Sequence, residues 1–294
     1  MYETITYNVF HEKAYNYLIW LYFYVGGMGA GSFLVSALSN LYGNEKYKKF
    51  TEIGAISSIV LIIIGGLLLL MDLGQPLRAF YLLTHFSPTS PVSWGTIFIG
   101  GFSIISILYN YFLFIDKNNE KARICSKVGI CFSIAVASYA SLLIALAKAR
   151  PLWHSAVMPP LFLISSCISG MAIVLLIVNI LKTESIEQSA MERMGKILAI
   201  MILIDIFLLS DMYILYIGFA EAHEMALLLL VGKYAFLFWG IELCLGSIFP
   251  VYLLLSKKLS KNRGVMILSS VCSLIGVLAM RYIIVIVGQH FPLS

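Results

Sequence analysis

Long apolar runs separated by short charged segments dominate the sequence. Eight of these runs reach the length, about 20 residues, that a helix needs to cross the hydrocarbon core of a membrane. The polar breaks between them are short, as at Gly43-Asn44 and Lys257–Arg263. The pattern predicts an all-α integral membrane protein with eight transmembrane helices in a single domain, residues 1–294. The expected spans are approximately 16–41, 53–72, 91–115, 126–147, 156–181, 194–218, 231–256 and 264–288.

Composition supports the same class of protein. Of the 294 residues, 60% are hydrophobic and 12% are charged, and the mean hydropathy is +0.92. Soluble proteins average about 45–50% apolar and about 25% charged residues. The 20 Lys and Arg residues are interspersed with 15 Asp and Glu residues, so there is no basic stripe of the kind that binds nucleic acid. We expect membrane lipid around the chain and no nucleic-acid partner.

The distribution of basic residues predicts the orientation. The side of the membrane that carries the N-terminus holds six of the 20 basic residues, which leaves 14 for the loops of the opposite side. Cytoplasmic loops carry the excess of positive charge, so both termini are predicted on the outer, periplasmic side of the cell (cytoplasmic) membrane. The two longest connections, 73–90 and 219–230, and all five histidines also fall in or near outer segments. Elaborated loops predict an outward functional face, although a preference of His for interfaces explains the histidines equally well.

The positions of the histidines and cysteines predict that this chain holds no metal centre. No expected span contains a His, whereas a b-type haem in a helical bundle needs axial ligands that project from the helices. The five cysteines form no C-x-x-C pair, whereas an iron–sulfur cluster or a structural zinc needs clustered thiolates. We expect no haem, iron–sulfur cluster or other metal here. Electrons would have to come from a metal centre on another chain or from a lipid-soluble carrier.

The first span carries a glycine-rich segment and a candidate ligand-binding tyrosine. Gly27 and Gly31 are four residues apart, a spacing that lets helix backbones approach closely; a glycine-lined slot for a planar ligand is the alternative. Tyr22 on this span and Tyr139 on the fourth lie roughly 9 Å and roughly 13 Å inside the same outer face. Two phenols at similar depth can hydrogen-bond one carbonyl-bearing headgroup, although tyrosines are also common in interface belts.

Two outer loops are rich in polar and turn-forming residues. Asp72 and Arg78 flank the end of the second span, where they can form a structural pair or contact a ligand. Pro91 is expected to open the third helix. The loop after the fourth span contains Arg150 and Trp153, which either anchor it at the interface or dock a partner protein.

Four ionisable residues lie within the later spans. Intramembrane charges are costly and by default mark a functional path or a paired group. Asp211 and Arg281 each lie roughly 10 Å from the outer ends of their helices, which predicts a structural ion pair. Asp205 and Glu242 lie nearer mid-membrane with no evident cation, which makes them candidates for a proton relay.

Taken together, these segments resemble the NrfD-like family, which includes the membrane subunit of polysulfide reductase. The resemblance implies eight helices in two four-helix bundles, with helices 1–4 (about 16–147) holding a quinone site and helices 5–8 (about 156–288) forming the second bundle. The motifs that carry it are spread in order over the chain: Gly26–Gly31, Asp72-Leu73-Gly74-Gln75-Pro76-Leu77-Arg78, Ser87-Pro88-Thr89-Ser90-Pro91-Val92-Ser93-Trp94-Gly95, Ser138-Tyr139, Arg150-Pro151-Leu152-Trp153, Phe238-Trp239-Gly240 with Pro250, and Arg281-Tyr282 through Gly288-Gln289.

The function that this resemblance implies is that of a membrane anchor subunit in a respiratory oxidoreductase complex. Such a subunit passes electrons between menaquinol, or another quinone, and a ferredoxin-like iron–sulfur subunit, usually beside a molybdopterin catalytic subunit that acts on the terminal substrate. Tyr139 is implied to bind the quinone with polar groups of the first helix. Where some relatives have Asn or His on that helix, this sequence has Trp20, Tyr22 and Tyr24.

Further roles follow from the same resemblance as expectations. Asp72 and His154 join Tyr139, Tyr22 and Trp20 as candidate quinone-site residues. Proton translocation would use Asp205, Glu242, Asp211 and Arg281, and partner docking would use Arg78, His85, Arg150 and Trp153. Two alternatives stay open. A secondary transporter would show helices broken near the midplane, whereas here proline falls mainly at ends and loops; a structural anchor would lack quinone chemistry.

Overall fold

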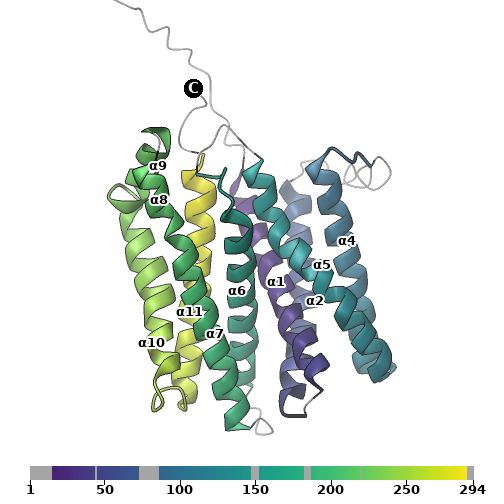
Figure 1. The fold of residues 1–294 in the computed structure, drawn as a ribbon. Coiled ribbons are helices and arrows are strands. Elements are labelled where there is room, and N and C mark those ends of the chain that lie inside the picture. Colours follow the sequence, from purple (N-terminus) through teal and green to yellow (C-terminus); the bar gives the residue numbers. More distant parts are fainter. Residues whose placement is uncertain are drawn as a thin grey trace, which may run out of the picture.

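The computed structural model describes residues 15–43, 45–72, 86–146, 152–181, 187–218 and 220–289. In these ranges the regular structure is entirely helical, and eight helices are long and apolar enough to cross a membrane. The protein is therefore a multi-pass integral membrane protein (Figure 1). The principal helices are α1 (Tyr17–Tyr42), α2 (Lys48–Asp72), α4 (Pro91–Asn110), α5 (Asn119–Ala145), α6 (Met158–Ile180), α7 (Gln188–Leu209), α10 (Phe249–Leu255) and α11 (Arg263–Val287).

Shorter helical segments extend or join these spans. Two of them are π-helical: η3 (Tyr111–Ile115) continues α4, and η4 (Phe236–Ile248) leads into α10. The others are the 3-10 turn η1 (Glu45–Tyr47) before α2, and α8 (Asp211–Ile217) and α9 (Ala220–Leu230) after α7. Pro91 opens α4 as predicted. The described part of the protein thus matches the expected number and order of spans.

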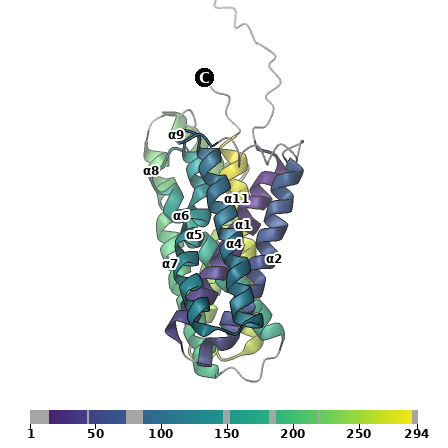
Figure 2. The ribbon, with the colours of Figure 1, turned by 90° about the vertical axis from the view of Figure 1, so that its right-hand side faces the viewer.

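Helices α1 and α6 lie side by side in the middle of the molecule. α1 also packs against α2 and α5, and α6 against α7 and α11 (Figures 1 and 2). α1 begins and α11 ends at the same end of the molecule, which we call the terminal end and which is uppermost in Figure 1. The division into two four-helix bundles and the outward orientation of the terminal end stay predictions.

Small residues bring α1 and α6 into backbone contact. A methyl group at Gly31 would overlap the carbonyl oxygen of Ser166, and one at Gly170 would overlap the backbone of Gly31. A Cβ atom at Gly27 would lie 2.6 Å from Ser166 Oγ. The close-packing explanation of the Gly27 and Gly31 spacing is confirmed, because neither position has room for a side chain.

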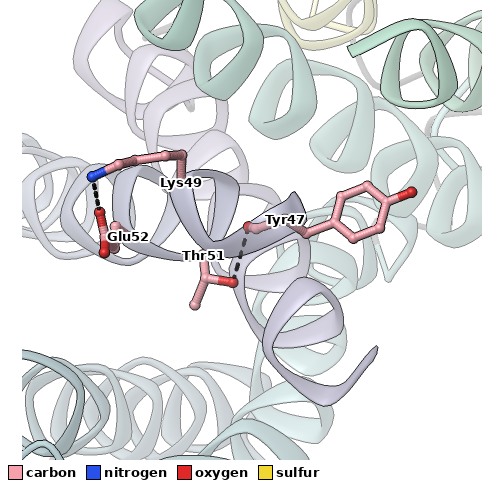
Figure 3. A network of polar contacts seen from close by, with 4 residues as sticks. All are labelled: Tyr47, Lys49, Thr51 and Glu52. Atoms are coloured by element: carbon pink, nitrogen blue, oxygen red, sulfur yellow. Dashed lines mark hydrogen bonds and ion pairs between the residues drawn. The ribbon is translucent and has the colours of Figure 1, made fainter. Parts of the chain in front are cut away.

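The turn between α1 and α2 shows why the helices extend beyond the apolar runs of the sequence. Gly43 ends α1 with a left-handed φ of 63°, a conformation that glycine adopts without steric cost. α2 begins at Lys48, five residues before the predicted start at 53, because its charged first turn is helical. There Lys49 Nζ lies 2.7 Å from Glu52 Oε2, and Thr51 Oγ1 donates to the carbonyl of Tyr47 (3.3 Å; Figure 3).

One prediction about the later spans is wrong. The segment 219–230, expected to be a long connection, forms helix α9 over Ala220–Leu230, whose Ala, Glu, Met and Leu residues all have high helix propensity. The sixth span is present but is interrupted at Ser210, because α7 ends at Leu209 and α8 begins at Asp211. At the break, the Ser210 hydroxyl donates to the carbonyl of Phe207 (2.6 Å), a local bond that competes with the helical ladder.

Candidate functional site

Tyr22 of α1 and Tyr139 of α5 form a buried pair of phenols near the terminal end. Each side chain is 6% exposed, and the helices that carry them, α1 and α5, pack against each other. Of the candidates Trp20, Tyr22 and Tyr24 on the first helix, only Tyr22 is expected to face Tyr139. Residues two apart on a helix point in nearly opposite directions. The Tyr24 hydroxyl donates to the carbonyl of Leu274 on α11 (3.0 Å), away from Tyr139.

Glycines give both phenols their space. A methyl group at Gly95 of α4 would overlap the phenol of Tyr139, so this ring passes directly against the α4 backbone. A Cβ atom at Gly26 would lie 3.3 Å from Cε2 of Tyr22. The Phe98 ring closes one side of Tyr139 in an edge-on contact, with centroids 6.2 Å apart. The Tyr139 phenol is thus enclosed between α4 and α5, and Tyr22 approaches α2, where a Cβ atom at Gly65 would lie 3.7 Å from its Cδ2.

The other three residues expected at the quinone site do not join the pair. Trp20 packs edge-on against Tyr282 of α11 (5.4 Å between centroids), so it lies on a different face of α1 from Tyr22. His154 Nδ1 lies 3.0 Å from the carbonyl of Ala145, which ties the loop before α6 to the end of α5. Asp72 is the last residue of α2 and is partly exposed at the terminal end.

The docking prediction for Trp153 is wrong for its side chain. Trp153 is 1% exposed, and its indole N–H donates to the carbonyl of Ile284 on α11 (2.8 Å). A methyl group at Gly288 would overlap this indole, so the side chain fills the interior. The other docking candidates, Arg78, His85 and Arg150, lie outside the described residues.

Arg281 is a fully buried cation where α11 meets α6. It is 1% exposed, and its guanidinium lies 3.8 Å from the Phe162 ring centroid, a cation–π geometry. Its Nη2 donates to the carbonyl of Phe162 (2.9 Å) and to the hydroxyls of Ser165 (2.9 Å) and Ser166 (3.0 Å). The two adjacent serines inside an apolar run were the signal in the sequence for this site.

The ion pair predicted between Asp211 and Arg281 is wrong. Asp211 Oδ2 instead accepts a hydrogen bond from the Ser155 hydroxyl (2.6 Å), which links α8 to the loop before α6. Asp205 and Glu242 stay candidates for a proton relay, and both are buried.

Asp205, Glu242 and Arg281 are buried ionisable residues of α7, η4 and α11, and η4 packs against both of the other helices; we call these three residues the charge cluster. Asp205 is 5% exposed and Glu242 is 2% exposed. Within the described ranges, several polar atoms have no hydrogen-bond partner: Asp205 Oδ1, both carboxylate oxygens of Glu242, Arg281 Nε and Nη1, and the hydroxyls of Ser270 and Ser273 on α11. Buried polar groups of this kind hydrogen-bond internal water. Glu242 also lies in the π-helical segment η4, and such segments are frequent at functional sites.

An apolar hollow of about 410 Å³ lies nearer the terminal end than Asp205 and Glu242, and exposed side chains such as Tyr213 and Trp239 line part of it. Leu209 and Phe238, two of its lining residues, lie one turn from Asp205 and Glu242 in that direction. The partnerless hydroxyls of α11 lie on the other side of the cluster. The polar atoms thus extend from the cluster toward the end opposite the termini.

The fold and these two sites define a class: a multi-span helical membrane protein with a buried pair of phenols near one end and a separate buried charge cluster. A match to the family model "Polysulphide reductase, NrfD" covers residues 7–293. The chain belongs to this family.

Curated relatives span nearly all of the sequence. It is 25% identical to the Hdr-like menaquinol oxidoreductase integral membrane subunit of Archaeoglobus fulgidus, over 92% of this sequence and 69% of that protein. It is 25% identical to one of the chains of the polysulfide reductase of Wolinella succinogenes, over 95% of this sequence and 97% of that protein. It is 23% identical to one of the subunits of the selenate reductase of Mesobacillus selenatarsenatis, over 93% of this sequence and 74% of that protein. The protein is thus similar to subunits of several oxidoreductases, one of them named as an integral membrane subunit.

Proposed function

We propose that this protein is the quinone-binding membrane subunit of a respiratory oxidoreductase complex. It would exchange electrons between menaquinol, or another quinone, and a peripheral iron–sulfur subunit. The observation that carries the proposal is the Tyr22–Tyr139 pair, two buried phenols on the packed helices α1 and α5 near one end of the spans. One relative is named as part of a menaquinol oxidoreductase and another as part of a polysulfide reductase, which supports the same function.

The residues around the pair fit a quinone headgroup. A quinone presents carbonyl oxygens on a flat ring, and phenols donate hydrogen bonds to such oxygens. Gly95 leaves no side chain between α4 and the Tyr139 phenol, and Phe98 adds an aromatic wall. Tyr22 and Tyr139 would hold a headgroup oxygen, and the surrounding apolar side chains would exclude water.

The chemistry then divides between the bound quinol and the protein. A bound quinol supplies two electrons and two protons when it is oxidised. The Tyr139 hydroxyl would orient the reacting oxygen and exchange a proton with it, and the Tyr22 hydroxyl would fix the same headgroup from α1. Both phenols lie near the terminal end, so electrons would travel only a short distance to a subunit docked there.

The proposed partner is a ferredoxin-like iron–sulfur subunit, with a molybdopterin subunit that reduces the terminal substrate. The relatives are named as parts of multi-subunit oxidoreductases, which supports partners of this general kind. Asp72, at the end of α2, and His154, in the loop before α6, lie on the same end and remain candidates for proton exchange there. The docking roles of Arg78, His85 and Arg150 stay predictions.

Hydroxyl deletion tests the proposal. The complex would be purified from native membranes in mild detergent, and oxidation of a soluble menaquinol analogue would be followed spectroscopically. Tyr139→Phe keeps the ring and removes the hydroxyl. We expect kcat/KM to fall by about tenfold or more, the loss of one or two neutral hydrogen bonds. Tyr22→Phe should act in the same direction.

The matched control is Tyr252→Phe, because Tyr252 lies on α10 and is 67% exposed. This variant should turn over like the native protein. If the complex oxidises quinol and neither Tyr139→Phe nor Tyr22→Phe changes the rate, the quinone site lies elsewhere. A purely structural anchor is then the better description.

We also propose that the buried charge cluster conducts protons during turnover. Asp205, Glu242 and Arg281 are buried on packed elements of the structure and carry several partnerless polar atoms. Water bound to these atoms would link the cluster to the hydroxyls of Ser270 and Ser273. Asp211 is a weaker member of this path, because its carboxylate is already bonded to Ser155.

Vesicles containing the complex test this second proposal. In the double variant Asp205→Asn, Glu242→Gln, quinol oxidation should continue while proton transfer across the membrane falls. The control is Glu52→Gln, because Glu52 pairs with Lys49 in the first turn of α2, outside the charge cluster. Unchanged proton transfer in the double variant would remove the charge cluster from the path.

A further inference from the structure

A row of aromatic side chains leads from the surface at the terminal end to the Tyr139 phenol. Phe86 and Trp94 meet edge-on, with ring centroids 5.4 Å apart. The centroids of Trp94 and Phe98 lie 6.0 Å apart, and Phe98 meets Tyr139 edge-on at 6.2 Å. Aromatic pairs in proteins have centroids about 4.5–7 Å apart. Each step of the row is therefore a direct ring contact.

The exposure of these side chains falls along the row. Phe86 is 44% exposed and Trp94 is 43% exposed, whereas Phe98 is partly buried and Tyr139 is 6% exposed. Helix α4 carries Trp94 and Phe98, and it is the least buried of the eight spans that the structure describes: 17% of its apolar segment is buried, against 67% for α1. In a membrane the exposed face of α4 contacts lipid, so the row begins where lipid-dissolved molecules can reach it.

The hydroxyl of Tyr139 lies against the same helix. A methyl group at Gly95 would overlap the phenol oxygen as well as the ring. Gly95 directly follows Trp94 on α4 and lies three residues before Phe98, one turn away. A ligand that forms a hydrogen bond with the Tyr139 hydroxyl therefore has to lie close to α4 and to these two aromatic side chains.

The Trp94 ring is held in place by the loop before α4. Its indole N–H donates to the carbonyl of Pro88 (3.0 Å), and Phe86 packs on its ring. The backbone N–H of Ser87 donates to Ser93 Oγ (3.3 Å), which ties this loop to the first turn of the helix. A tryptophan that only anchors a helix at the membrane interface needs no contact with the interior, whereas the contacts of Trp94 continue inward to Tyr139.

We propose that Trp94 and Phe98 form a lateral entrance to the quinol site and favour a fused two-ring headgroup, as in menaquinol, over a single-ring headgroup. This inference rests on the quinone-binding function proposed above. A flat headgroup that leaves the lipid would stack on these side chains before its oxygen reaches the Tyr139 hydroxyl. A fused ring system presents more apolar area to them than a single ring does, so it gains more from the contact.

Substitutions in the row test the entrance in the intact complex, with oxidation of a menaquinol analogue and of a single-ring benzoquinol analogue measured side by side. Phe98→Leu keeps an apolar side chain and removes the aromatic face. We expect kcat/KM for the menaquinol analogue to fall by about threefold to tenfold, the range for loss of one aromatic contact. The change should appear mainly in KM, because the contact aids binding rather than the reaction itself, and the preference for the two-ring substrate should shrink.

Trp94 allows a loss and a rescue at the same position. Trp94→Ala should raise KM and reduce the headgroup preference in the same way as Phe98→Leu. Trp94→Phe keeps an aromatic ring and loses only the N–H bond to Pro88, so it should retain most of the native KM and preference. Recovery with phenylalanine would show that the ring, and not the hydrogen bond that holds the loop, serves the substrate.

Trp239→Ala is the matched control. Trp239 is 50% exposed, and its indole N–H also donates to a backbone carbonyl, that of Leu230 (2.9 Å). Its ring packs on Phe238, outside the row that leads to Tyr139. This variant should keep the native KM and headgroup preference. Thermal unfolding of all variants would be measured on the same samples.

The outcomes separate the entrance from the function on which it rests. If Tyr139→Phe impairs turnover while Trp94→Ala and Phe98→Leu keep the native KM and preference, the quinone site stands and the entrance is wrong. If Trp239→Ala raises KM as much as Trp94→Ala does, loss of any interface aromatic is the cause, and the entrance is again wrong. If the native complex neither binds nor oxidises either quinol analogue, the proposed function is wrong and the entrance fails with it.

Discussion

Gly95 offers a test of the site that leaves every polar group in place. In Gly95→Ala the new methyl group would overlap the far end of the Tyr139 ring, including its hydroxyl. A flexible ring yields more easily than the α4 backbone, so the phenol should swing aside by about 1 Å or more. A displacement of that size costs a reaction about 100-fold when the displaced group positions the reacting atoms. Alanine also favours the helix by about 1 kcal/mol over glycine, so the variant should remain folded.

Helix α4 supplies two matched controls. A Cβ atom at Gly100 meets nothing within 4 Å, so Gly100→Ala should be neutral or slightly stabilising and should leave turnover unchanged. A methyl group at Gly101 would overlap the Phe132 ring, away from Tyr139. Gly101→Ala therefore introduces crowding of the same kind without touching the site, and its cost should appear in thermal stability.

The assay is steady-state oxidation of a menaquinol analogue by the complex, with thermal unfolding in detergent measured on the same samples. We expect Gly95→Ala to lose most of its kcat/KM, and the other two variants to retain theirs. If Gly95→Ala and Gly101→Ala lose activity equally, crowding in α4 is the cause. If all three variants turn over normally, the position of the Tyr139 phenol has no part in catalysis.

Two further predictions concern stability. Arg281→Met removes a buried cation that donates hydrogen bonds to Phe162 and to two serines. A hydrogen bond to a charged group contributes about 1.5–3 kcal/mol, so thermal unfolding should occur at a clearly lower temperature. An unchanged midpoint would contradict a stabilising role for the Arg281 guanidinium. At the opposite end, hydrogen bonds from Lys46 and Ser189 lower the pKa of the Glu187 carboxyl. A lowered pKa stabilises the folded state above the pKa of the unfolded protein, and this stabilisation is lost as pH falls through the folded pKa. The native protein should therefore unfold at a slightly higher temperature than Glu187→Gln at neutral pH, and this difference should disappear in acid. A difference that does not change with pH would contradict the lowered pKa of Glu187.

The spans were predictable because lipid imposes a length and a composition on any helix that crosses it. The helix ends were less so, because charged turns such as Lys48–Glu52 stay helical beyond the apolar run. The break at Ser210 and the helix α9 depend on local hydrogen bonds and on packing. Hydropathy counts do not register these effects.

The contacts within the site were only partly predictable. Depth along the helices placed Tyr22 and Tyr139 at one level, and the structure buries both side chains on helices that pack against each other. Depth alone also suggested the Asp211–Arg281 pair, which is wrong because the rotation of each helix decides which groups meet. Asp211 follows the break at Ser210, so the phase of α7 does not fix its direction.

The hydrogen bonds between Tyr15 and Gln289 could not be predicted from the pattern of hydrophobic spans. They join two residues that lie outside the apolar runs and 274 positions apart. The sequence did contain one clue that Tyr22 and Tyr24 of α1 face different neighbours. Tyr22 and Tyr24 are two residues apart and must point to nearly opposite faces of a helix, so they could not both contact Tyr139.

The most direct test of the central claim is to locate the bound quinone chemically. The intact complex would be labelled with a photoreactive menaquinone analogue, with excess unlabelled quinone as competitor, and the modified peptides would be mapped by mass spectrometry. We expect competed labelling on α1 around Tyr22 and on α5 around Tyr139. Competed labelling confined to the last four spans, with none on α1 or α5, would contradict the claim.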